Sequence, residues 1–246
     1  DERCSLMCEH DYFITRQAAR AGIQPFFGVQ SSAIRISRMY QLQADGIGKR
    51  FGRRVLFRQL SFTAIPGKIV AVTGSNGSGK STLIRILAGV MKPTRGKVVL
   101  EIKGKAVEEA RIPMHVGMVA PYLNLYDAFT PRENLRFIAR ARGMSDYTRR
   151  IEKVLDEVFL LTRADDLVGT FSSGMKQRMR FAFALFSHPA VLLLDEPTAN
   201  LDSDGVDMVE RLTSRANRNG QIVIVATNDA REAEACDEII CVEEFL

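Results

Sequence analysis

The sequence predicts an α/β fold in which short buried strands alternate with helices along the chain. Residues 191–194 and 222–226 are continuous apolar runs of strand length, which is typical of parallel strands covered on both faces. Residues 68–73 form a third, β-branched run, followed by a glycine-rich loop and an apolar run of helical length. This alternation of strands and helices makes the fold class α/β.

The length and composition predict a folded globular protein. At 246 residues the chain is long enough for one large domain or two small ones, and its 46% hydrophobic content is ample for a packed core. No run approaches 18 consecutive apolar residues, so any membrane role is expected to come through a partner chain. The net charge of +5 comes from Lys and Arg scattered among acids without interleaved aromatic residues, which favours a solvated surface over a nucleic-acid site.

The four cysteines lie at opposite ends of the chain, at Cys4, Cys8, Cys236 and Cys241. Cys4 and Cys8 could form half of a metal site together with His10. However, no second ligand pair follows at zinc spacing. We therefore expect reduced thiols and a cytoplasmic compartment.

Residues 1–38 differ from the rest of the chain, because they show no sustained helix or strand period and do not begin with methionine. They also lack the apolar core of about 7–15 residues that a signal peptide needs. We expect them to be a disordered extension, or sequence upstream of a true start at Met39. The predicted globular domain covers residues 39–246.

Within this domain, further short strands are expected between turn residues, at 42–47, 55–64, 97–102, 116–120 and 238–242. A turn at Phe51 and Gly52 joins the first two strands, and a Pro-Thr-Arg-Gly turn precedes the third. Phe51 is expected to be a core or edge aromatic residue.

Three helices are expected between the strands at 116–120 and 191–194. Two cover residues 131–142 and 146–161, and the segment 171–178 leads into a third, which runs to Phe186. The first opens with a capping box, Thr130-Pro131-Arg132-Glu133, with proline at the first helical position. The last follows a Ser-Ser-Gly cap and is stopped by Pro189.

Residues 74–82 fit the phosphate-binding pattern G-x-x-x-x-G-K-[ST] at every required position. The glycines would let backbone N–H groups turn toward phosphates, and the helix that begins near Lys80 would point its positive end at the same anion. Lys80 would reach the β- and γ-phosphates, and the hydroxyl of Ser81 would hold Mg²⁺. The strand before the loop and the helix after it argue against a chance match.

Two carboxylates, Asp195 and Glu196, follow the buried strand at 191–194. Acids at the carboxyl end of a parallel strand lie beside the glycine loop in such folds. The alternative is that they only cap the turn that follows. The buried strand at 222–226 similarly ends in polar residues, Thr227-Asn228-Asp229.

The order of these motifs resembles the nucleotide-binding subunit of ABC transporters, with resemblance over residues 40–246. The motifs that carry it are the glycine loop, Ser172-Ser173-Gly174-Met175, Leu-Asp-Glu-Pro-Thr-Ala-Asn-Leu-Asp at 194–202, and Thr227-Asn228-Asp229. The resemblance implies a P-loop NTPase fold with a mixed sheet core, an antiparallel β part and an inserted α-helical subdomain at about residues 128–187. The segment after the last expected strand is short, which is similar to small exporter subunits such as the haem-exporter type linked to cytochrome c assembly.

This resemblance implies ATP and Mg²⁺ as ligands and two subunits that close head to tail on two ATP molecules. Triphosphate would be bound by Gly74, Ser75, Asn76, Gly77, Ser78, Gly79, Lys80, Ser81 and Thr82. Phe51 would stack on adenine, Asp195 would hold the metal with Ser81, and Glu196 would polarise the attacking water. Ser172, Ser173, Gly174 and Met175 would act on the partner's site, and Asp202 would lie on the loop linking the two sites.

The chain departs from the family pattern at several positions. Alignment on Thr130 puts Pro121 where the family usually has a glutamine. Asn228 replaces the usual switch histidine. By the resemblance, Asn228 is a catalytic residue together with Lys80 and Glu196. Proline offers no side-chain hydrogen bond, and asparagine cannot carry the charge of an imidazolium. Binding of ATP is therefore expected to be intact, with hydrolysis reduced.

The function implied is an ATP-hydrolysing subunit that powers a transporter, an exporter by this resemblance, from the cytoplasmic face of the membrane. Residues 122–129 would receive the coupling helix of a transmembrane permease subunit, and no nucleic-acid partner is expected. Two alternatives stay open. One is a regulatory subunit impaired in hydrolysis, and the other is a soluble ABC protein acting on ribosomes or DNA. Proteins of the latter kind generally carry two cassettes or a coiled-coil insertion, which this sequence lacks.

Overall fold

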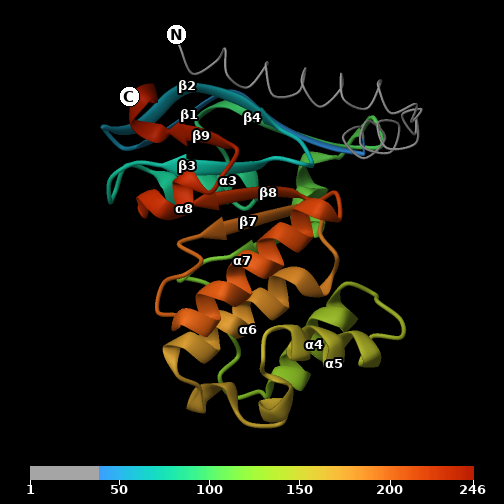
Figure 1. Cartoon of the computed structure of the whole chain (residues 1–246). Helices are drawn as coiled ribbons and strands as arrows, with labels where there is room; N and C mark the ends of the chain where they lie inside the picture. The colour runs from blue at the N-terminus through green and yellow to red at the C-terminus, as the bar shows by residue number, and fades with distance from the viewer. Residues whose placement is uncertain (1–38) are drawn as a thin grey trace, which may run out of the picture. The chain divides into compact units, whose positions relative to one another are not determined.

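The computed structural model describes residues 39–246, drawn in colour in Figure 1. The expected extension at residues 1–38, with Cys4, Cys8 and His10, lies outside the described residues. Among the described residues, Cys236 and Cys241 are free cysteines. No helix of residues 39–246 is both long enough and apolar enough to cross a bilayer.

An antiparallel sheet forms from the strands on either side of the Phe51–Gly52 turn and the strands after the first helix. Its spatial order is β2-β1-β4-β5, and the strands are β1 (Tyr40–Phe51), β2 (Arg54–Ala64), β4 (Arg95–Ile102) and β5 (Lys105–Ala106). The hairpin of β1 and β2 closes with Phe51 paired to Arg54. The antiparallel part implied by the family resemblance is thus present.

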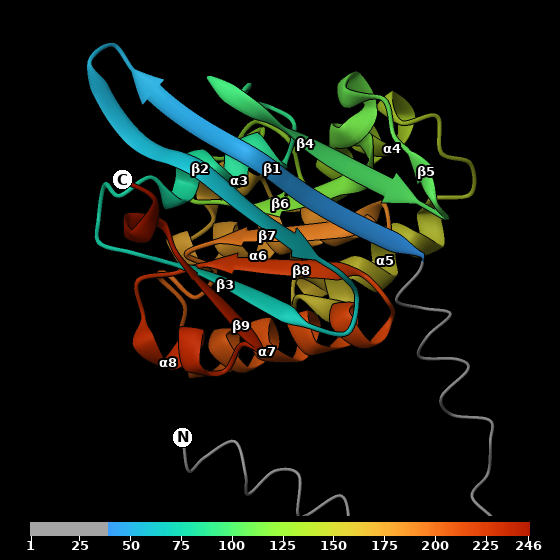
Figure 2. The same cartoon turned by 90° about the horizontal axis from the view of Figure 1, so that it is seen from above.

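The second sheet is parallel throughout and has the order β6-β7-β8-β3-β9. Its strands are β3 (Ile69–Thr73), β6 (Val116–Val119), β7 (Val191–Asp195), β8 (Ile222–Ala226) and β9 (Glu238–Cys241). Seen from above, β1, β2 and β4 pass across this sheet (Figure 2). Because the strands are parallel, the loops that follow β3, β6, β7 and β8 leave the sheet at the same edge.

Six α-helices lie among the described residues, together with short 3₁₀ segments. They are α3 (Lys80–Leu87), α4 (Pro131–Ala141), α5 (Thr148–Glu157), α6 (Ser173–Phe186), α7 (Ser203–Arg218) and α8 (Ala230–Glu234). The 3₁₀ segments are η1 (Glu109–His115), η2 (Leu161–Arg163), η3 (Val168–Thr170) and η4 (Val242–Phe245). The α/β fold class is confirmed.

The predicted capping box at the start of α4 is confirmed. The backbone N–H of Glu133 donates to Thr130 Oγ1 at 3.2 Å, and the N–H of Thr130 donates to Glu133 Oε2 at 2.9 Å. Both bonds satisfy N–H groups that the first turn of a helix leaves without partners.

Several sequence-based boundaries were wrong, including the ends of α5 and β9. The helix expected over 146–161 ends at Glu157, because Phe159 adopts a left-handed backbone with φ of +58° and Leu161–Arg163 forms a separate 3₁₀ turn. The strand expected over 238–242 ends one residue early, since Val242 begins η4. The apolar spacing that predicted both elements continues past the point where the backbone turns.

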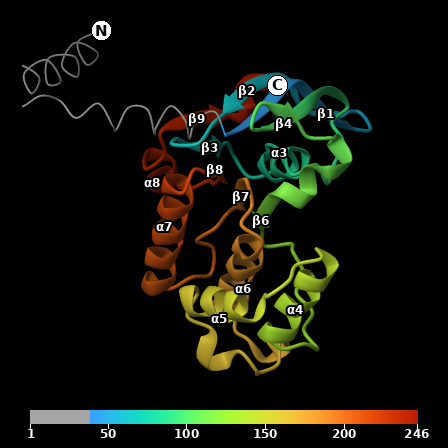
Figure 3. The same ribbon diagram turned by 90° about the vertical axis from the view of Figure 1, so that its right-hand side faces the viewer.

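The central strands β7 and β8 of the parallel sheet are buried on both faces, as their continuous apolar sequences predict, whereas the edge strand β9 is partly exposed. In β7, Val191 and Leu193 pack into a core with α3 and the antiparallel sheet, whereas Leu192 and Leu194 pack against α6 and α7. Figure 3 shows α3 and these two helices on opposite sides of the sheet. At Gly117 of β6, a Cβ would lie 2.2 Å from the carbonyl oxygen of Ala184, so only glycine allows α6 to pack this closely.

Candidate nucleotide site

The glycine loop lies between β3 and α3, where its sequence pattern placed it. Gly74, Gly77 and Gly79 have φ values of +143°, +83° and +116°, which side-chain-bearing residues rarely adopt. The first turn of α3 carries no acidic residue, and no side chain caps its N–H groups. These N–H groups are therefore available to an anion such as a phosphate.

Lys80 is almost fully buried at the start of α3, with 5% of its surface exposed. Its Nζ donates to the carbonyl oxygen of Gly74 at 2.8 Å and to that of Ser75 at 3.3 Å. The same amine lies 3.8 Å from Glu196 Oε1. The cation thus stands at the centre of the loop, between its carbonyl groups and the carboxylate that follows β7.

Asp195 ends β7 with only 1% of its surface exposed, and neither carboxylate oxygen has a hydrogen-bond partner among the described residues. Burial raises the pKa of Asp195, while the hydroxyls of Ser81 and Tyr122 are close enough to lower the pKa in part. Within residues 39–246, no cluster of three or more His, Cys, Asp or Glu could hold a metal by itself. Mg²⁺ fits this arrangement, because it takes one or two protein ligands and completes its shell with water and phosphate oxygens.

Glu196 comes next and has a left-handed backbone, with φ of +48°. Burial raises the pKa of Glu196, and the Lys80 ammonium group acts in the opposite direction. The N–H of Glu196 donates to the carbonyl of Ala226 in β8 at 2.8 Å. This bond joins the acidic loop to the strand that carries Asn228.

Asn228 lies beside the glycine loop. Its Nδ2 donates to Asn76 Oδ1 at 3.2 Å, and the N–H of Thr227 donates to the carbonyl of Val72 in β3 at 3.1 Å. The structure therefore brings together the three loops that the sequence singled out, after β3, β7 and β8. The ammonium group of Lys80, the carboxylates of Asp195 and Glu196, and the amide of Asn228 therefore meet at one edge of the parallel sheet.

Phe51 lies at the tip of the β1–β2 hairpin with 50% of its surface exposed. Lys49 Nζ lies 5.0 Å from the centroid of its ring. Arg54, paired with Phe51 across the hairpin, donates from Nη2 to the carbonyl of Gly77 at 2.9 Å. An exposed aromatic ring is thus connected to the glycine loop through one cross-strand pair, a link that sequence reasoning missed.

The Ser-Ser-Gly-Met segment forms the start of α6, where Ser172 Oγ accepts from the N–H of Met175 at 3.2 Å. Ser172 and Ser173 are exposed. A Cβ on Gly174 would lie 3.1 Å from the carbonyl oxygen of Asn200, so this segment contacts the loop that follows β7. Its hydrogen bonds in the described structure do not reach the glycine loop of the same chain.

Two side chains of α6 tie this helix to the loop after Glu196. Gln177 Nε2 donates to the carbonyl of Pro197 at 3.0 Å in a buried contact. Arg178 donates to Asp202 Oδ1 at 2.8 Å, and the same oxygen caps α7 by accepting from the N–H of Gly205 at 2.9 Å. Asp202 therefore lies between α6 and α7.

Comparison with known families agrees with this geometry. Residues 57–199 match the sequence model of a family described as ABC transporter. The chain belongs to the ABC transporter family. This cassette is 34% identical over 206 residues to an uncharacterised ABC transporter ATP-binding protein, YdbJ, of Bacillus subtilis strain 168, covering 82% of this chain. It is 36% identical over 204 residues, 81% of this chain, to the Nod factor export ATP-binding protein I of Rhizobium sp. strain N33. The match spans 66% of the length of each relative.

Solved structures of ABC cassettes have the same fold. An ATP-binding subunit of an ABC transporter superposes with a TM-score of 0.73 at 27% identity, over 81% of this chain and 85% of that one. A dimeric cassette in a post-hydrolysis state, bound to ADP and Pi, superposes with a TM-score of 0.72 at 26% identity, over 81% and 93% of the two chains.

A residue of η4, far from the glycine loop in the sequence, also forms hydrogen bonds to this loop. Glu243, in the 3₁₀ turn η4, accepts at Oε1 from the N–H of Ser75 at 3.0 Å and also from the Ser75 hydroxyl. These bonds lower the pKa of Glu243. No sequence pattern indicated this contact, because the two residues are 168 positions apart.

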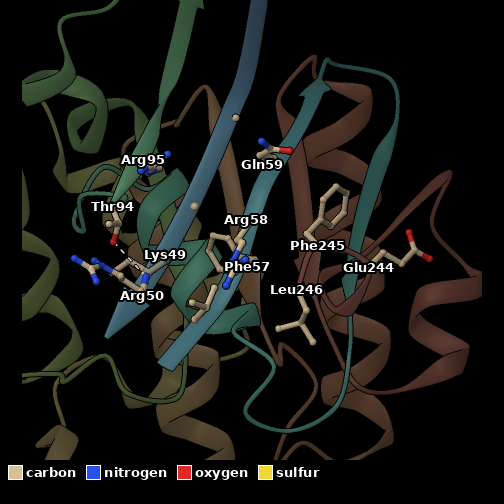
Figure 4. Close-up of a pocket in the computed structure, with 13 residues that line it drawn as sticks. Lys49, Arg50, Phe57, Arg58, Gln59, Thr94, Arg95, Glu244, Phe245 and Leu246 are labelled. Carbon is tan, nitrogen blue, oxygen red and sulfur yellow. Dashed lines mark hydrogen bonds between the residues drawn. The ribbon is translucent and has the colours of Figure 1, made fainter. Parts of the chain in front are cut away.

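An open pocket of about 1200 Å³ lies over β1 and β2, away from this site (Figure 4). Its rim carries Lys49, Arg50, Arg58 and Arg95, and Phe245 and Leu246 flank β2. No residue of the glycine loop lines the pocket. This pocket is therefore distinct from the convergence of loops at the sheet edge.

Proposed function

We propose that this ABC cassette binds Mg-ATP, hydrolyses it, and as a dimer powers a membrane transporter of the export type. The observation that carries the proposal is the convergence of Lys80, Asp195 and Glu196 on one glycine loop. Phosphoryl transfer needs mainly positioning and charge neutralisation, plus one group that orients water. These three side chains match those needs.

Each residue has a separate part in the proposed mechanism. Mg²⁺ would be held by Asp195 and Ser81, and when bound it supplies charge neutralisation to the phosphates. The N–H groups at the start of α3 would bind phosphate oxygens, and Lys80 would exchange its carbonyl partners for them. Glu196 would accept a hydrogen bond from the attacking water, which requires its ionised form. Phe51 would stack on the adenine ring.

The dimer is proposed because the signature residues, 172–175, have no role in their own chain's nucleotide site. Ser172 and Ser173 are exposed at the start of a helix, where N–H groups attract an anion. A γ-phosphate presented by a second subunit would meet this requirement. The solved relative that is a dimer with ADP and Pi supports the arrangement.

A surface beside the helical block supports a permease partner at the cytoplasmic face of a membrane. Tyr126, Phe129 and Phe137 form an exposed aromatic cluster, with ring centroids 5.6 Å apart for Tyr126–Phe129 and 5.2 Å for Tyr126–Phe137. Next to the cluster, a groove of about 250 Å³ is lined by apolar side chains that include Leu125 and Ile138. Exposed apolar surface of this kind marks an interaction site, and a helix of a transmembrane subunit fits it.

A second candidate, a regulatory subunit that binds ATP and hardly hydrolyses it, is favoured by one observation. Asn228 donates its amide to Asn76 and has no charge to offer a γ-phosphate. Both candidates share the same ATP-binding dimer. They differ only in the rate of turnover.

ATP-dependent dimerisation of the Glu196→Gln variant tests the proposal. Loss of the carboxylate should stop hydrolysis and leave ATP trapped between two subunits, so sedimentation velocity should show monomers without nucleotide and dimers with Mg-ATP. Glu210→Gln, on the exposed side of α7, is the matched control and should behave as wild type. A monomer under all conditions would reject the shared site. Co-purification of the native protein with a multi-span membrane protein tests the transport part separately.

A further inference from the structure

We propose that the hydroxyl group of Tyr122 is a hydrogen-bonding group of the metal site beside Asp195. The side chain of Pro121 cannot form such a hydrogen bond. The inference rests on the proposed Mg-ATP function and deepens it. It assigns a positioning residue that neither the glycine loop nor the signature pattern includes. With this role for Tyr122, the proline at position 121 does not leave the metal site without a hydrogen-bonding side chain.

The hydroxyl of Tyr122 is in an unusual state. Its oxygen is buried, yet it has no hydrogen-bond partner among the described residues. Pro121, in contrast, is exposed. A buried polar group without a partner in a folded protein calls for an explanation, such as a ligand or water that completes the site.

The strand register puts Tyr122 next to the acidic loop. β6 and β7 are parallel neighbours, and Val119 at the end of β6 pairs with Leu194 at the end of β7. The segments that follow β6 and β7 leave the sheet at the same edge, so Asp195 and Tyr122 lie side by side. Two unpartnered carboxylate oxygens of Asp195 and the unpartnered hydroxyl of Tyr122 therefore lie in one buried place.

Helix α3 contacts the ring of Tyr122 through Arg85. The guanidinium carbon of Arg85 lies 3.8 Å from the ring centroid. Ser81 and Arg85 are four residues apart on α3, so they share one face of this helix. The ring of Tyr122 therefore packs on the face of α3 that carries Ser81.

The charges around Tyr122 agree with close contact. Burial raises the pKa of Tyr122, the nearby Asp195 carboxylate raises it further, and Arg85 acts against both. A tyrosine hydroxyl can both donate and accept a hydrogen bond. Mg²⁺ keeps several of its waters when it binds to proteins, and each of those waters needs hydrogen-bond acceptors. The Tyr122 oxygen is in a position to serve one of them.

Tyr122→Phe is the decisive variant, because it removes one oxygen and leaves the ring under Arg85. The apparent affinity for the metal should be measured by titrating Mn²⁺, followed by electron paramagnetic resonance, at a fixed concentration of a non-hydrolysable ATP analogue. Loss of a group that supports metal ligands typically weakens metal affinity by about 10- to 100-fold. Nucleotide affinity in EDTA should not change, and the melting temperature without ligand should stay equal or rise, since a buried unpaired hydroxyl is removed.

Tyr147→Phe, at the start of α5, is the control and should match wild type in all three measurements. Equal Mn²⁺ affinity in Tyr122→Phe and wild type would overturn the inference while leaving the nucleotide site standing. A loss of nucleotide affinity in EDTA, or a fall in melting temperature, would assign Tyr122 a structural role and also overturn it. Failure of wild type to bind the nucleotide at all would instead reject the proposed function.

Discussion

Replacing Lys80 with alanine is the sharpest test of the glycine loop, because this side chain is buried and its amine has three oxygen neighbours. Nζ lies 2.8 Å from Gly74 O, 3.3 Å from Ser75 O and 3.8 Å from Glu196 Oε1. With Mg-ATP bound, we expect the amine to exchange the two carbonyls for charged phosphate oxygens. Truncating one member of a buried charged pair costs about 2–5 kcal/mol of binding free energy.

The structure indicates the lower part of this range. Lys80 already has two hydrogen bonds in the free protein, so only the excess of the phosphate bonds over the carbonyl bonds contributes to affinity. A loss of about 2–3 kcal/mol corresponds to a roughly 30- to 150-fold higher Kd for ATP. Isothermal titration calorimetry measures this change directly. Lys97→Ala, an exposed lysine of β4, is the matched control and should keep wild-type affinity.

A folded Lys80→Ala variant whose Kd for ATP lies within about threefold of wild type would refute the reasoning, since that difference is below 1 kcal/mol. Circular dichroism and thermal unfolding must accompany the titration. The variant leaves Gly74 O and Ser75 O without their donor, and it removes the cation nearest to Glu196. A modest loss of stability is therefore expected and does not by itself count against the site.

Two further predictions concern turnover and stability. Asn228→His should raise the ATPase rate at saturating ATP, by up to about 10²–10³ if it restores one full transition-state hydrogen bond, with little change in KM; a flat or lower steady-state rate would show that this loop is not the switch. Thr130→Ala should lower the free energy of unfolding by about 1 kcal/mol through loss of the capping box at α4. Denaturant unfolding measures it against the exposed Thr162→Ala, and equal stability of the two variants would contradict the prediction.

Local patterns predicted the parts of this protein that depend on neighbouring residues. The apolar runs of β7 and β8 gave buried parallel strands, and Thr130 with Glu133 gave the start of α4. The glycine loop was found because its backbone conformation requires glycine at defined positions. Each of these signals is contained in fewer than about a dozen neighbouring residues of sequence.

The features that escaped prediction depend on contacts between distant segments or on single backbone angles. The bond between Glu243 and Ser75 joins η4 to the glycine loop and has no local signal. Phe159 ends α5 through a left-handed φ that apolar periodicity does not encode. Helix α7 was also not predicted, although Asp202 caps it by accepting a hydrogen bond from the N–H of Gly205. Similarly, alignment placed Pro121 at the site, whereas in the structure the neighbouring Tyr122 has a buried hydroxyl without a hydrogen-bond partner among the described residues.

The left-handed backbone of Glu196 sets the stability of the fold against the chemistry of the site. A residue with a Cβ in this conformation costs about 1–2 kcal/mol relative to its ordinary backbone state, and glycine or asparagine would relieve part of that cost. The peptide bond of Glu196 is fixed by its N–H bond to Ala226, so the strain is built into the edge of the sheet. Glycine at this position would therefore relieve backbone strain and stabilise the fold, but it would also remove the carboxylate that lies 3.8 Å from Lys80 Nζ.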